Sequence, residues 1–401
     1  MKDFVKLIVM LVARFTLKIF WIFPVNKNKM LFCSFEGKQY SCNPKYLFIQ
    51  IAAQFDNKYS YIWVLNNKNS EDYNRLLLDI SEINRKLKDL ISVKIVRFFS
   101  IRHFYHYLTS KYIISNLNIE PVIPKRKNQV YLATWHASGA YKNMDFSDSL
   151  KPTAYKVKAR DFRAENIDFY VSGCGAFTNV YVQTWNTKKE KFISCGLPRN
   201  DLFFAGEDVL DTKKKEIKDR LKLSDDCSYI LFAPTYRGLN NHNHKSFSFE
   251  LDVNALIRAC ENRFGKKFKM LLKNHVDTAS SDVLNAQNVI EVSWYSDMQE
   301  LLLISDILLT DYSSSIWDFA LLNKPSFLYT PDLQAYLKER GFYTPIEKWP
   351  FDYAASNDEL VKLVEKFDEE KNKKKIREHF EFMESFESGT ACNQIIKRLG
   401  L

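Results

Sequence analysis

The sequence predicts an α/β protein built from two doubly wound domains in tandem. From about residue 28 onwards, short apolar runs of strand length alternate with segments of helix length, which is the pattern of parallel sheets made from βαβ units. The alternation occurs in two blocks, separated by a charged stretch at 207–222 that is typical of a solvated helix. A chain of 401 residues is also too long for one ordinary core and suits two domains of roughly 150–200 residues.

The first predicted element is an amphipathic helix at 4–23, FVKLIVMLVARFTLKIFWIF. Its length would just span a bilayer, but Lys6, Arg14 and Lys18 interrupt it and fall within about a third of the helix circumference. We therefore expect a helix in the plane of a membrane surface, with the cations at anionic headgroups and the apolar face in the acyl boundary. A core-packed helix and a spanning anchor are the alternatives. No small-residue cleavage site follows, which disfavours a removed signal peptide.

The rest of the chain is predicted to form one domain over 25–205 and a second over 206–401, after the membrane-association helix of 1–24. In the first block, strands are predicted at 30–35, 59–65, 93–98, 112–115, 130–135, 169–171 and 192–195, and helices at 44–54 and 75–90. In the second block, strands are predicted at 229–233, 268–272, 289–292, 307–310 and 327–329, and helices at 252–263, 297–305, 314–322 and 359–370. Ligands are expected at the carboxyl ends of these strands, in a cleft between the domains.

Composition narrows the class of partner. Hydrophobic residues make up 46% and charged residues 26%, which excludes a disordered chain. The net charge of +10 favours an anionic partner. Because no arginine-rich run or zinc-finger spacing occurs, acidic lipid or a phosphorylated substrate is favoured over nucleic acid. The seven cysteines include no CxxC pair, so we expect neither a disulfide framework nor a structural zinc site, and a reducing cytosolic compartment.

The most informative stretch is 307–319, ILLTDYSSSIWDF. A buried strand ends in Thr310 and Asp311, and serines that include Ser313 and Ser314 open the next helix. Free N–H groups at a helix start bind phosphate, and serine hydroxyls add donors to the same oxygens. Simple helix capping is the alternative. Neither GxGxxG nor GxxxxGK(S/T) occurs, which argues against a dinucleotide-dependent dehydrogenase and a P-loop enzyme.

Two other strands of the second block end in cationic side chains. The stretch ILFAPTYRG places Thr235 and Arg237 at a strand end, and MLLKNH does the same for Lys273 and His275. Arginine binds phosphate in a bidentate manner, and histidine can donate to a phosphoryl oxygen or shuttle a proton. A surface ion pair for the arginine and a structural role for the histidine are the alternatives.

The first block also has a histidine at a strand end. In YLATWHASGAYKNMD, His136 ends the strand, and the small residues that follow permit close approach of a ligand. A general base opposite a phosphate site is the arrangement that a phosphoryl or glycosyl transferase needs. Arg199, in the turn CGLPRND, is expected to be structural or to belong to the acceptor side.

Together these stretches resemble the CDP-glycerol glycerophosphotransferase family, the teichoic-acid polymerases and primases. The resemblance implies a GT-B fold with two Rossmann-like domains. It also implies a peripheral enzyme of cell-wall teichoic acid biosynthesis on the cytoplasmic face of the cell membrane. The family's glycine after the first histidine is Ala137 here, and its proline after the second is Val276. The stretches that carry the resemblance are TWH at 134–136, GLPRND at 196–201, APTYR at 233–237, TDYSS at 310–314 and RGFY at 340–343.

The resemblance also implies a reaction. The donor is CDP-glycerol or CDP-ribitol, the acceptor hydroxyl attacks the phosphorus nearer the alditol, and CMP leaves. The implied catalytic residues are His136 as base, Asp145 as an acid nearby in sequence, and His275. The implied donor side consists of Thr235, Arg237, Lys273, Thr310, Asp311, Ser313, Ser314 and Arg340. The implied acceptor side consists of Ser138, Lys142 and Arg199.

No Asp-x-Asp motif occurs, so no metal or other cofactor is expected to be obligatory, while Mg²⁺ on the diphosphate is compatible with the sequence. The expected acceptor is a polyprenyl-linked or glycan hydroxyl. A GT-B nucleotide-sugar glycosyltransferase and a non-catalytic membrane-associated scaffold are the alternative functions. The sequence does not decide whether glycerol or ribitol is carried, or whether one unit or a polymer is added. It also does not decide the oligomeric state.

Overall fold

The computed structural model describes residues 2–87, 89–137, 139, 141–143, 152–235, 250–273 and 288–401. The chain divides into two compact units. Unit 1 contains Met1–His136, Met144–Asp201 and Ser385–Leu401, and unit 2 contains Ala137–Asn143 and Leu202–Glu384. This division differs from the predicted one, because Ala137–Asn143 and 202–205 belong to unit 2. Ser385–Leu401 and the helix of 1–24, which was predicted as a separate segment, belong to unit 1.

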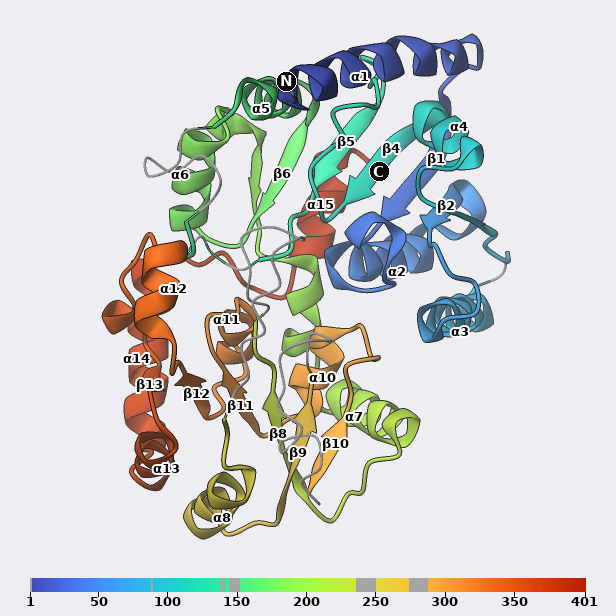
Figure 1. Cartoon of the computed structure of the whole chain (residues 1–401). Helices are drawn as coiled ribbons and strands as arrows, with labels where there is room; N and C mark the ends of the chain where they lie inside the picture. Colours follow the sequence, from blue (N-terminus) through green and yellow to red (C-terminus); the bar gives the residue numbers. More distant parts are fainter. Residues whose placement is uncertain are drawn as a thin grey trace. The chain divides into compact units, whose positions relative to one another are not determined.

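Unit 1 is built on a seven-stranded parallel sheet of order β3-β2-β1-β4-β5-β6-β7 (Figure 1). The order reverses between β1 and β4, and ligands of open α/β sheets bind at such a switch point. All seven strands predicted in the first block are present. The strands are β1 (Asn26–Cys33), β2 (Ser60–Val64), β3 (Val93–Val96), β4 (Ser110–Ser115), β5 (Val130–Ala133), β6 (Phe169–Ser172) and β7 (Phe192–Ser194).

Helices cover both faces of this sheet, which explains why its strands are continuous apolar runs. On one face, Phe32 and Trp63 pack in a core with Phe48 of α2 and Ile395 of α15. On the other face, alternate strand residues such as Leu31 lie against α4. The helices are α1 (Lys2–Leu17), α2 (Cys42–Phe55), α3 (Glu71–Lys86), α4 (Ile101–Thr109), α5 (Ala154–Asn166), α6 (Gly175–Thr184) and α15 (Ala391–Leu399).

Helix α1 packs on unit 1, beside α5, through a narrow stripe of side chains (Figure 1). Met10 is 5% exposed, and Arg14 is half-buried. The Arg14 guanidinium lies 3.7 Å from the centre of the Phe162 ring and donates a hydrogen bond of 3.1 Å to the Pro121 carbonyl. The expectation that Arg14 faces lipid headgroups is therefore wrong, because a ring face and a carbonyl of the protein bind this cation instead.

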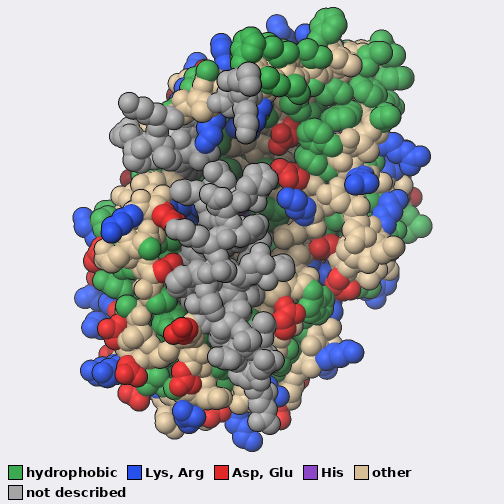
Figure 2. Space-filling view, viewed as in Figure 1, with side chains coloured by type: hydrophobic (Ala, Val, Ile, Leu, Met, Phe, Trp, Pro, Cys, Tyr) green, Lys and Arg blue, Asp and Glu red, His purple; other side chains and the backbone are tan. Residues whose placement is uncertain are grey.

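The outward side of α1 and of the following 3₁₀ helix η1 (Lys18–Ile22) is apolar. Figure 2 shows hydrophobic side chains gathered over this edge of the unit. A contiguous exposed apolar patch of this kind marks an interaction surface. No helix in the described part of the chain is both long and apolar enough to cross a membrane. The exposed side chains of the patch are Phe4, Val5, Ile8, Val9, Leu11, Val12, Phe15, Ile19 and Ile22.

The end of the chain returns to unit 1. Ile395 and Ile396 of α15 are buried in its core. The Asp201 carboxylate accepts hydrogen bonds from the backbone N–H groups of Ala391 (2.9 Å) and Cys392 (2.8 Å). Asp201 therefore caps the start of α15 from 190 residues away in sequence.

A second carboxylate strengthens this attachment. Glu387 accepts hydrogen bonds from the Leu197 backbone N–H (3.2 Å) and the Asn200 side-chain amide (2.9 Å). Gly196 has a φ of +87°, and a Cβ there would lie 2.8 Å from a Glu387 oxygen. The turn GLPRND is thus shaped to receive the C-terminal segment, and only glycine fits at its start.

Unit 2 is built on a six-stranded parallel sheet of order β10-β9-β8-β11-β12-β13, with the switch point between β8 and β11. The strands are β8 (Ser228–Phe232), β9 (Phe268–Leu272), β10 (Val289–Glu291), β11 (Ile307–Thr310), β12 (Ser326–Tyr329) and β13 (Asp352–Ala354). The five predicted strands are present, and β13 was not predicted. The helices are α7 (Glu207–Leu221), α8 (Val253–Phe264), α10 (Met298–Ile304), α11 (Ser315–Ala320), α12 (Leu333–Glu339), α13 (Asn357–Glu365) and α14 (Glu369–Phe382).

The Asp201 cap generates a stability prediction. Asp201→Ala removes the acceptor for two buried N–H groups and should lower the free energy of unfolding by about 1–2 kcal/mol. Hydrogen exchange measured by mass spectrometry should show faster exchange in 385–401 than in the wild type, with unit 2 unchanged. Asp201→Asn keeps one oxygen and should recover part of the protection. The exposed Asp89→Ala is the control, and unchanged exchange in Asp201→Ala would refute the cap.

Candidate active site

Side chains join the carboxyl ends of β8 and β11 at the switch point of unit 2. Asp311 is fully buried and accepts hydrogen bonds from both the backbone N–H and the hydroxyl of Thr235, each at 2.9 Å. The Thr310 hydroxyl donates to the Ala233 carbonyl at 2.6 Å. Three predicted donor-side residues are therefore brought together here. Thr310 and Asp311 therefore hold the loop that follows β8 in place. Thr310 binds its backbone at Ala233, and Asp311 binds the backbone and the side chain of Thr235.

Two of the predicted serines lie just beyond this junction and are half-buried. Helix α11 begins at Ser315, and Ser314, its N-cap residue, makes no side-chain capping bond. The Ser313 hydroxyl accepts hydrogen bonds from the backbone N–H (3.3 Å) and the hydroxyl (2.9 Å) of Ser315. Simple capping by Ser314 is thus not observed. Ser313 and Ser314 stand where polar side chains at the switch point would meet a ligand.

Aromatic stacking connects this junction with Lys142. The Tyr312 hydroxyl donates to Asp332 at 3.0 Å, and its ring stacks on Tyr336 with 3.9 Å between ring centres. The Lys142 ammonium lies 5.9 Å from the centre of the Tyr336 ring. Arg340 follows at the end of α12 and is exposed. Lys142, predicted for the acceptor side, therefore lies in the same unit as the predicted donor-side residues.

The segment that contains Lys142 is fastened to unit 2 by Tyr141. The Tyr141 ring stacks on Trp317 of α11 with 3.8 Å between ring centres and 7° between ring planes. Its hydroxyl lies 2.8 Å from His379 Nε2, and its carbonyl accepts from the Tyr343 N–H at 2.7 Å. Burial lowers the pKa of His379 to about 4, so this ring is neutral at physiological pH. Sequence reasoning missed this anchor because its residues are far apart in the chain.

Lys273 follows β9 and is half-buried. Its ammonium donates a hydrogen bond of 2.5 Å to the Tyr295 carbonyl. This bond connects the end of β9 to the segment that follows β10. This contact orients the Lys273 side chain. That Lys273 binds phosphate stays a prediction.

In unit 1, His136 lies just beyond the carboxyl end of β5 and is half-buried. Its Nδ1 is 3.3 Å from the Asn116 carbonyl oxygen. Since a carbonyl only accepts, this contact puts the proton on Nδ1 and leaves the lone pair of the neutral ring on Nε2. The ring also packs against Trp135 (4.5 Å between ring centres) and Phe35 (5.6 Å). A histidine held in this tautomer is suited to act as a general base through Nε2.

Asn43, which was not predicted to have a role, holds the loop before His136. Its amide nitrogen donates to the carbonyls of Thr134 (3.0 Å) and Trp135 (2.9 Å), and its amide oxygen accepts from the Arg199 N–H (3.1 Å). Arg199 is 3% exposed. This burial favours the structural alternative for Arg199 over a place on the acceptor side. The Asn-Pro pair at a helix start was the signal in the sequence.

The predicted residues Ser138, Asp145, Arg237 and His275 lie outside the described residues. Within the described ranges, no group of three or more His, Cys, Asp or Glu side chains is placed to hold a metal ion.

Comparisons with known proteins identify the family. A model of the CDP-glycerol:poly(glycerophosphate) glycerophosphotransferase family matches residues 15–400. The teichoic acid poly(glycerol phosphate) polymerase of Bacillus spizizenii is 28% identical over 392 residues, which are 95% of this chain and 94% of that protein. The teichoic acid poly(ribitol-phosphate) polymerase of the same organism is 26% identical over 95% of this chain and 58% of that protein.

Structural similarity agrees with this result. A solved structure of the wall teichoic acid polymerase TagF aligns with a TM-score of 0.77 and 26% identity, over 99% of this chain and 95% of that one. This alignment confirms the predicted α/β class with two parallel sheets of GT-B type. Because the family model matches nearly the whole sequence, the chain belongs to the CDP-glycerol glycerophosphotransferase family, as its motifs predicted.

Proposed function

We propose that this chain transfers glycerol phosphate or ribitol phosphate from a CDP-alditol to a hydroxyl of a polyprenyl-linked or glycan acceptor, in the synthesis of teichoic acid or a related surface polymer. The observation that carries the proposal is His136, which lies at a strand end with its Nδ1 3.3 Å from the Asn116 carbonyl oxygen, in a chain of this family.

In the proposed reaction, the acceptor oxygen forms a new bond to the phosphorus nearer the alditol. The bond from that phosphorus to the bridging oxygen breaks, and CMP carries away the electron pair. His136 Nε2 takes the proton of the attacking hydroxyl, and the Asn116 carbonyl stabilises the imidazolium that forms, because it accepts the proton on Nδ1. Because the proposed attack is direct, it forms no covalent bond to the enzyme, and positioning and electrostatic stabilisation would supply the catalysis.

The donor would bind at the switch point of unit 2. Ser313 and Ser314 would donate hydroxyl hydrogen bonds to the diphosphate, while Thr310, Asp311 and Thr235 hold the loop that leads to Arg237. Arg237 and His275 would supply the charge-assisted contacts that stabilise the leaving phosphate. Lys273 and Arg340 would add positive charge, and Lys142 and Ser138 would face the acceptor.

Peripheral attachment to the cytoplasmic face of the membrane would place the enzyme beside a lipid-linked acceptor. The apolar outward side of α1 and η1 supports this attachment, because burying large apolar side chains in the acyl boundary is favourable. Since Arg14 is engaged with Phe162 and Pro121, this attachment would depend more on apolar burial than on cations.

The proposal is tested by product analysis together with His136→Ala. The wild type should release CMP from CDP-glycerol or CDP-ribitol in the presence of a lipid-linked acceptor. His136→Ala should lower the rate about 10²–10⁴-fold through loss of the general base, with CDP-alditol affinity unchanged by calorimetry. His106→Gln, a half-buried histidine of α4, is the matched control.

Three outcomes would contradict this. Release of UDP from a UDP-sugar would indicate a glycosyltransferase, and no turnover with any CDP-alditol would indicate a scaffold. A His136→Ala rate above about half of the wild-type rate would place the base elsewhere.

The junction at Asp311 generates a prediction for donor binding. Asp311→Asn replaces one of the oxygens that accept from Thr235 and should weaken CDP-glycerol binding about 3- to 10-fold, because the loop that leads to Arg237 loses its anchor. Isothermal calorimetry measures this affinity, and the exposed Asp211→Asn is the control. Unchanged affinity with unchanged stability would show that the junction does not shape the donor site.

The exposed side of α1 generates a prediction for membrane binding. Replacing both Phe15 and Ile19 with serine should lower binding to phospholipid vesicles at least tenfold, because each side chain contributes about 1.5–3 kcal/mol when buried. Co-sedimentation at low and high salt measures this, and Lys6→Ser with Lys18→Ser is the matched control. If the lysine pair mattered more than the apolar pair, attachment would be electrostatic.

A further inference from the structure

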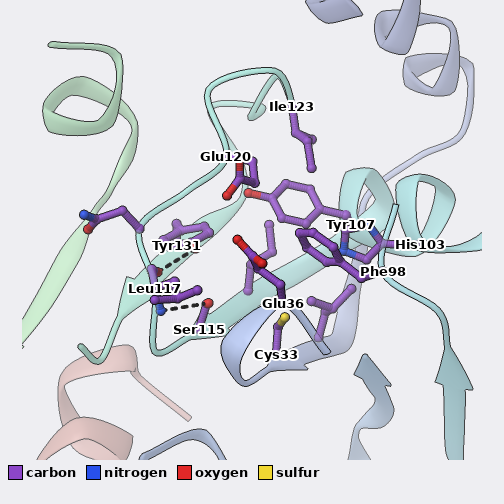
Figure 3. Close-up of a pocket in the computed structure, with 13 residues that line it drawn as sticks. Cys33, Glu36, Phe98, His103, Tyr107, Ser115, Leu117, Glu120, Ile123 and Tyr131 are labelled. Carbon is purple, nitrogen blue, oxygen red and sulfur yellow. Dashed lines mark hydrogen bonds between the residues drawn. The ribbon is translucent and has the colours of Figure 1, made fainter. Parts of the chain in front are cut away.

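A small pocket lies in unit 1 between the sheet and α4 (Figure 3). Its volume of about 20 Å³ admits one water-sized group. The polar side chains around it include Glu36, Tyr107, Ser115 and Glu120, which come from four different parts of the unit. Figure 3 shows the Glu36 and Glu120 carboxylates and the Tyr107 ring converging on the same space.

The Tyr107 hydroxyl is the first sign that this pocket receives a ligand. Tyr107 is 5% exposed, and its hydroxyl has no hydrogen-bond partner among the residues that the structure describes. Buried hydroxyls are normally paired, because leaving one unpaired is costly. The neighbouring Tyr131 shows the normal case, since its hydroxyl donates to the Leu117 carbonyl at 3.1 Å.

The Glu120 carboxylate is the second sign. Burial raises the pKa of Glu120, Arg163 opposes this shift and the nearby Glu36 carboxylate adds to it. No hydrogen-bond donor among the described residues reaches this carboxylate. An acceptor without a donor and a hydroxyl without a partner thus face the same water-sized space.

The chemistry of these groups selects the ligand. A hydroxyl can accept from Tyr107 and donate to Glu120 at the same time, whereas an ammonium group cannot accept. Phosphate is disfavoured, because two carboxylates line the pocket and no Lys or Arg does so among its described lining residues. Lys38 forms an ion pair of 3.3 Å with Glu36, but this pair is exposed and Lys38 does not line the pocket. Burial lowers the pKa of His103, also in the lining, to about 4, so this ring adds no positive charge. The pocket is therefore built for a neutral hydroxyl group.

Two residues that line the pocket are chain neighbours of residues that contact His136. Glu36 follows Phe35, whose ring packs against His136. Ser115 precedes Asn116, whose carbonyl binds His136 Nδ1. Glu36 and Ser115 thus come from the same two loops that position the proposed base.

We propose that the Glu36–Tyr107–Glu120 pocket is an acceptor subsite, which binds a hydroxyl of a polyol acceptor beside His136. This assignment rests on the proposed function and adds to it the chemical class of the group recognised at the acceptor. It predicts that carboxylates of unit 1 bind hydroxyl groups of the acceptor. It also predicts that this pocket does not bind the charged groups of the acceptor.

The test uses Tyr107→Phe and Glu120→Gln in the full chain. Calorimetry without donor measures binding of a soluble acceptor analogue that ends in glycerol phosphate with two free hydroxyls, and of its deoxy counterpart. Tyr107→Phe should weaken binding of the first analogue about 3- to 10-fold and Glu120→Gln about 10-fold or more. Neither substitution should change the affinity for CDP-glycerol. The difference in affinity between the two analogues should be smaller for Tyr107→Phe than for the wild type. Tyr105→Phe, on the same helix but outside the pocket lining, is the matched control.

A merely structural pocket would give a different result. If both variants bound the analogue as the wild type does, or if the wild type did not distinguish the two analogues, the pocket would hold only water and the proposal would be overturned. Thermal unfolding separates loss of binding from loss of folding, because neither substitution removes a hydrogen bond among the described residues and neither should lower the melting temperature. Since these measurements need no donor, a chain that bound the analogue as expected but released no CMP would refute the proposed function alone.

Discussion

In each unit, one buried polar side chain fixes a loop at the carboxyl end of the sheet. It forms hydrogen bonds with groups of that loop which the parallel strands leave unpaired. In unit 1 this is Asn43, which donates to the carbonyls of Thr134 and Trp135 and accepts from the Arg199 N–H. In unit 2 it is Asp311, which accepts from the N–H and the hydroxyl of Thr235. Parallel strands end with backbone groups that no neighbouring strand can bind, and leaving them buried and unpaired is costly. These two side chains therefore hold the loops after β5 and β8, which carry part of the predicted chemistry.

The family motifs accordingly combine two kinds of residue. Thr310, Asp311 and Arg199 are buried and make contacts within the protein, so their polar groups shape loops. His136, Ser313 and Ser314 are half-buried and stand at strand ends, where a substrate can be reached. A motif read from sequence does not separate the two kinds, because both need polar side chains at the same spacing. Burial and hydrogen-bond direction separate them, and for this reason Asp311 is better understood as a residue that positions Thr235 than as one that binds phosphate.

Local pattern was enough to predict twelve of the thirteen described strands, because strands buried on both faces are continuous apolar runs. It missed β13, a three-residue edge strand of which two residues are exposed, because such a strand has no apolar run. It recognised that α1 is amphipathic and placed Arg14 on the wrong side, since amphipathicity does not say which face packs on the protein. It also missed Asn43, Tyr141, His379 and the Tyr107 pocket, which all depend on contacts between residues far apart in the chain.

The exchange of segments between the units has a physical consequence for how this protein folds. Unit 1 is complete only after the last residues are present, because Ile395 and Ile396 belong to its core and the Ala391 and Cys392 N–H groups satisfy Asp201. Unit 2 in turn includes Ala137–Asn143, whose Tyr141 ring stacks on Trp317. A fragment that ended at residue 205 would therefore expose part of the first core and leave the half-buried Asp201 carboxylate without its two donors. Such contacts between distant parts of the chain slow folding, since loop closure must precede them. Each unit thus needs a segment that lies beyond its own block of strands in the sequence, although each sheet is built from consecutive strands.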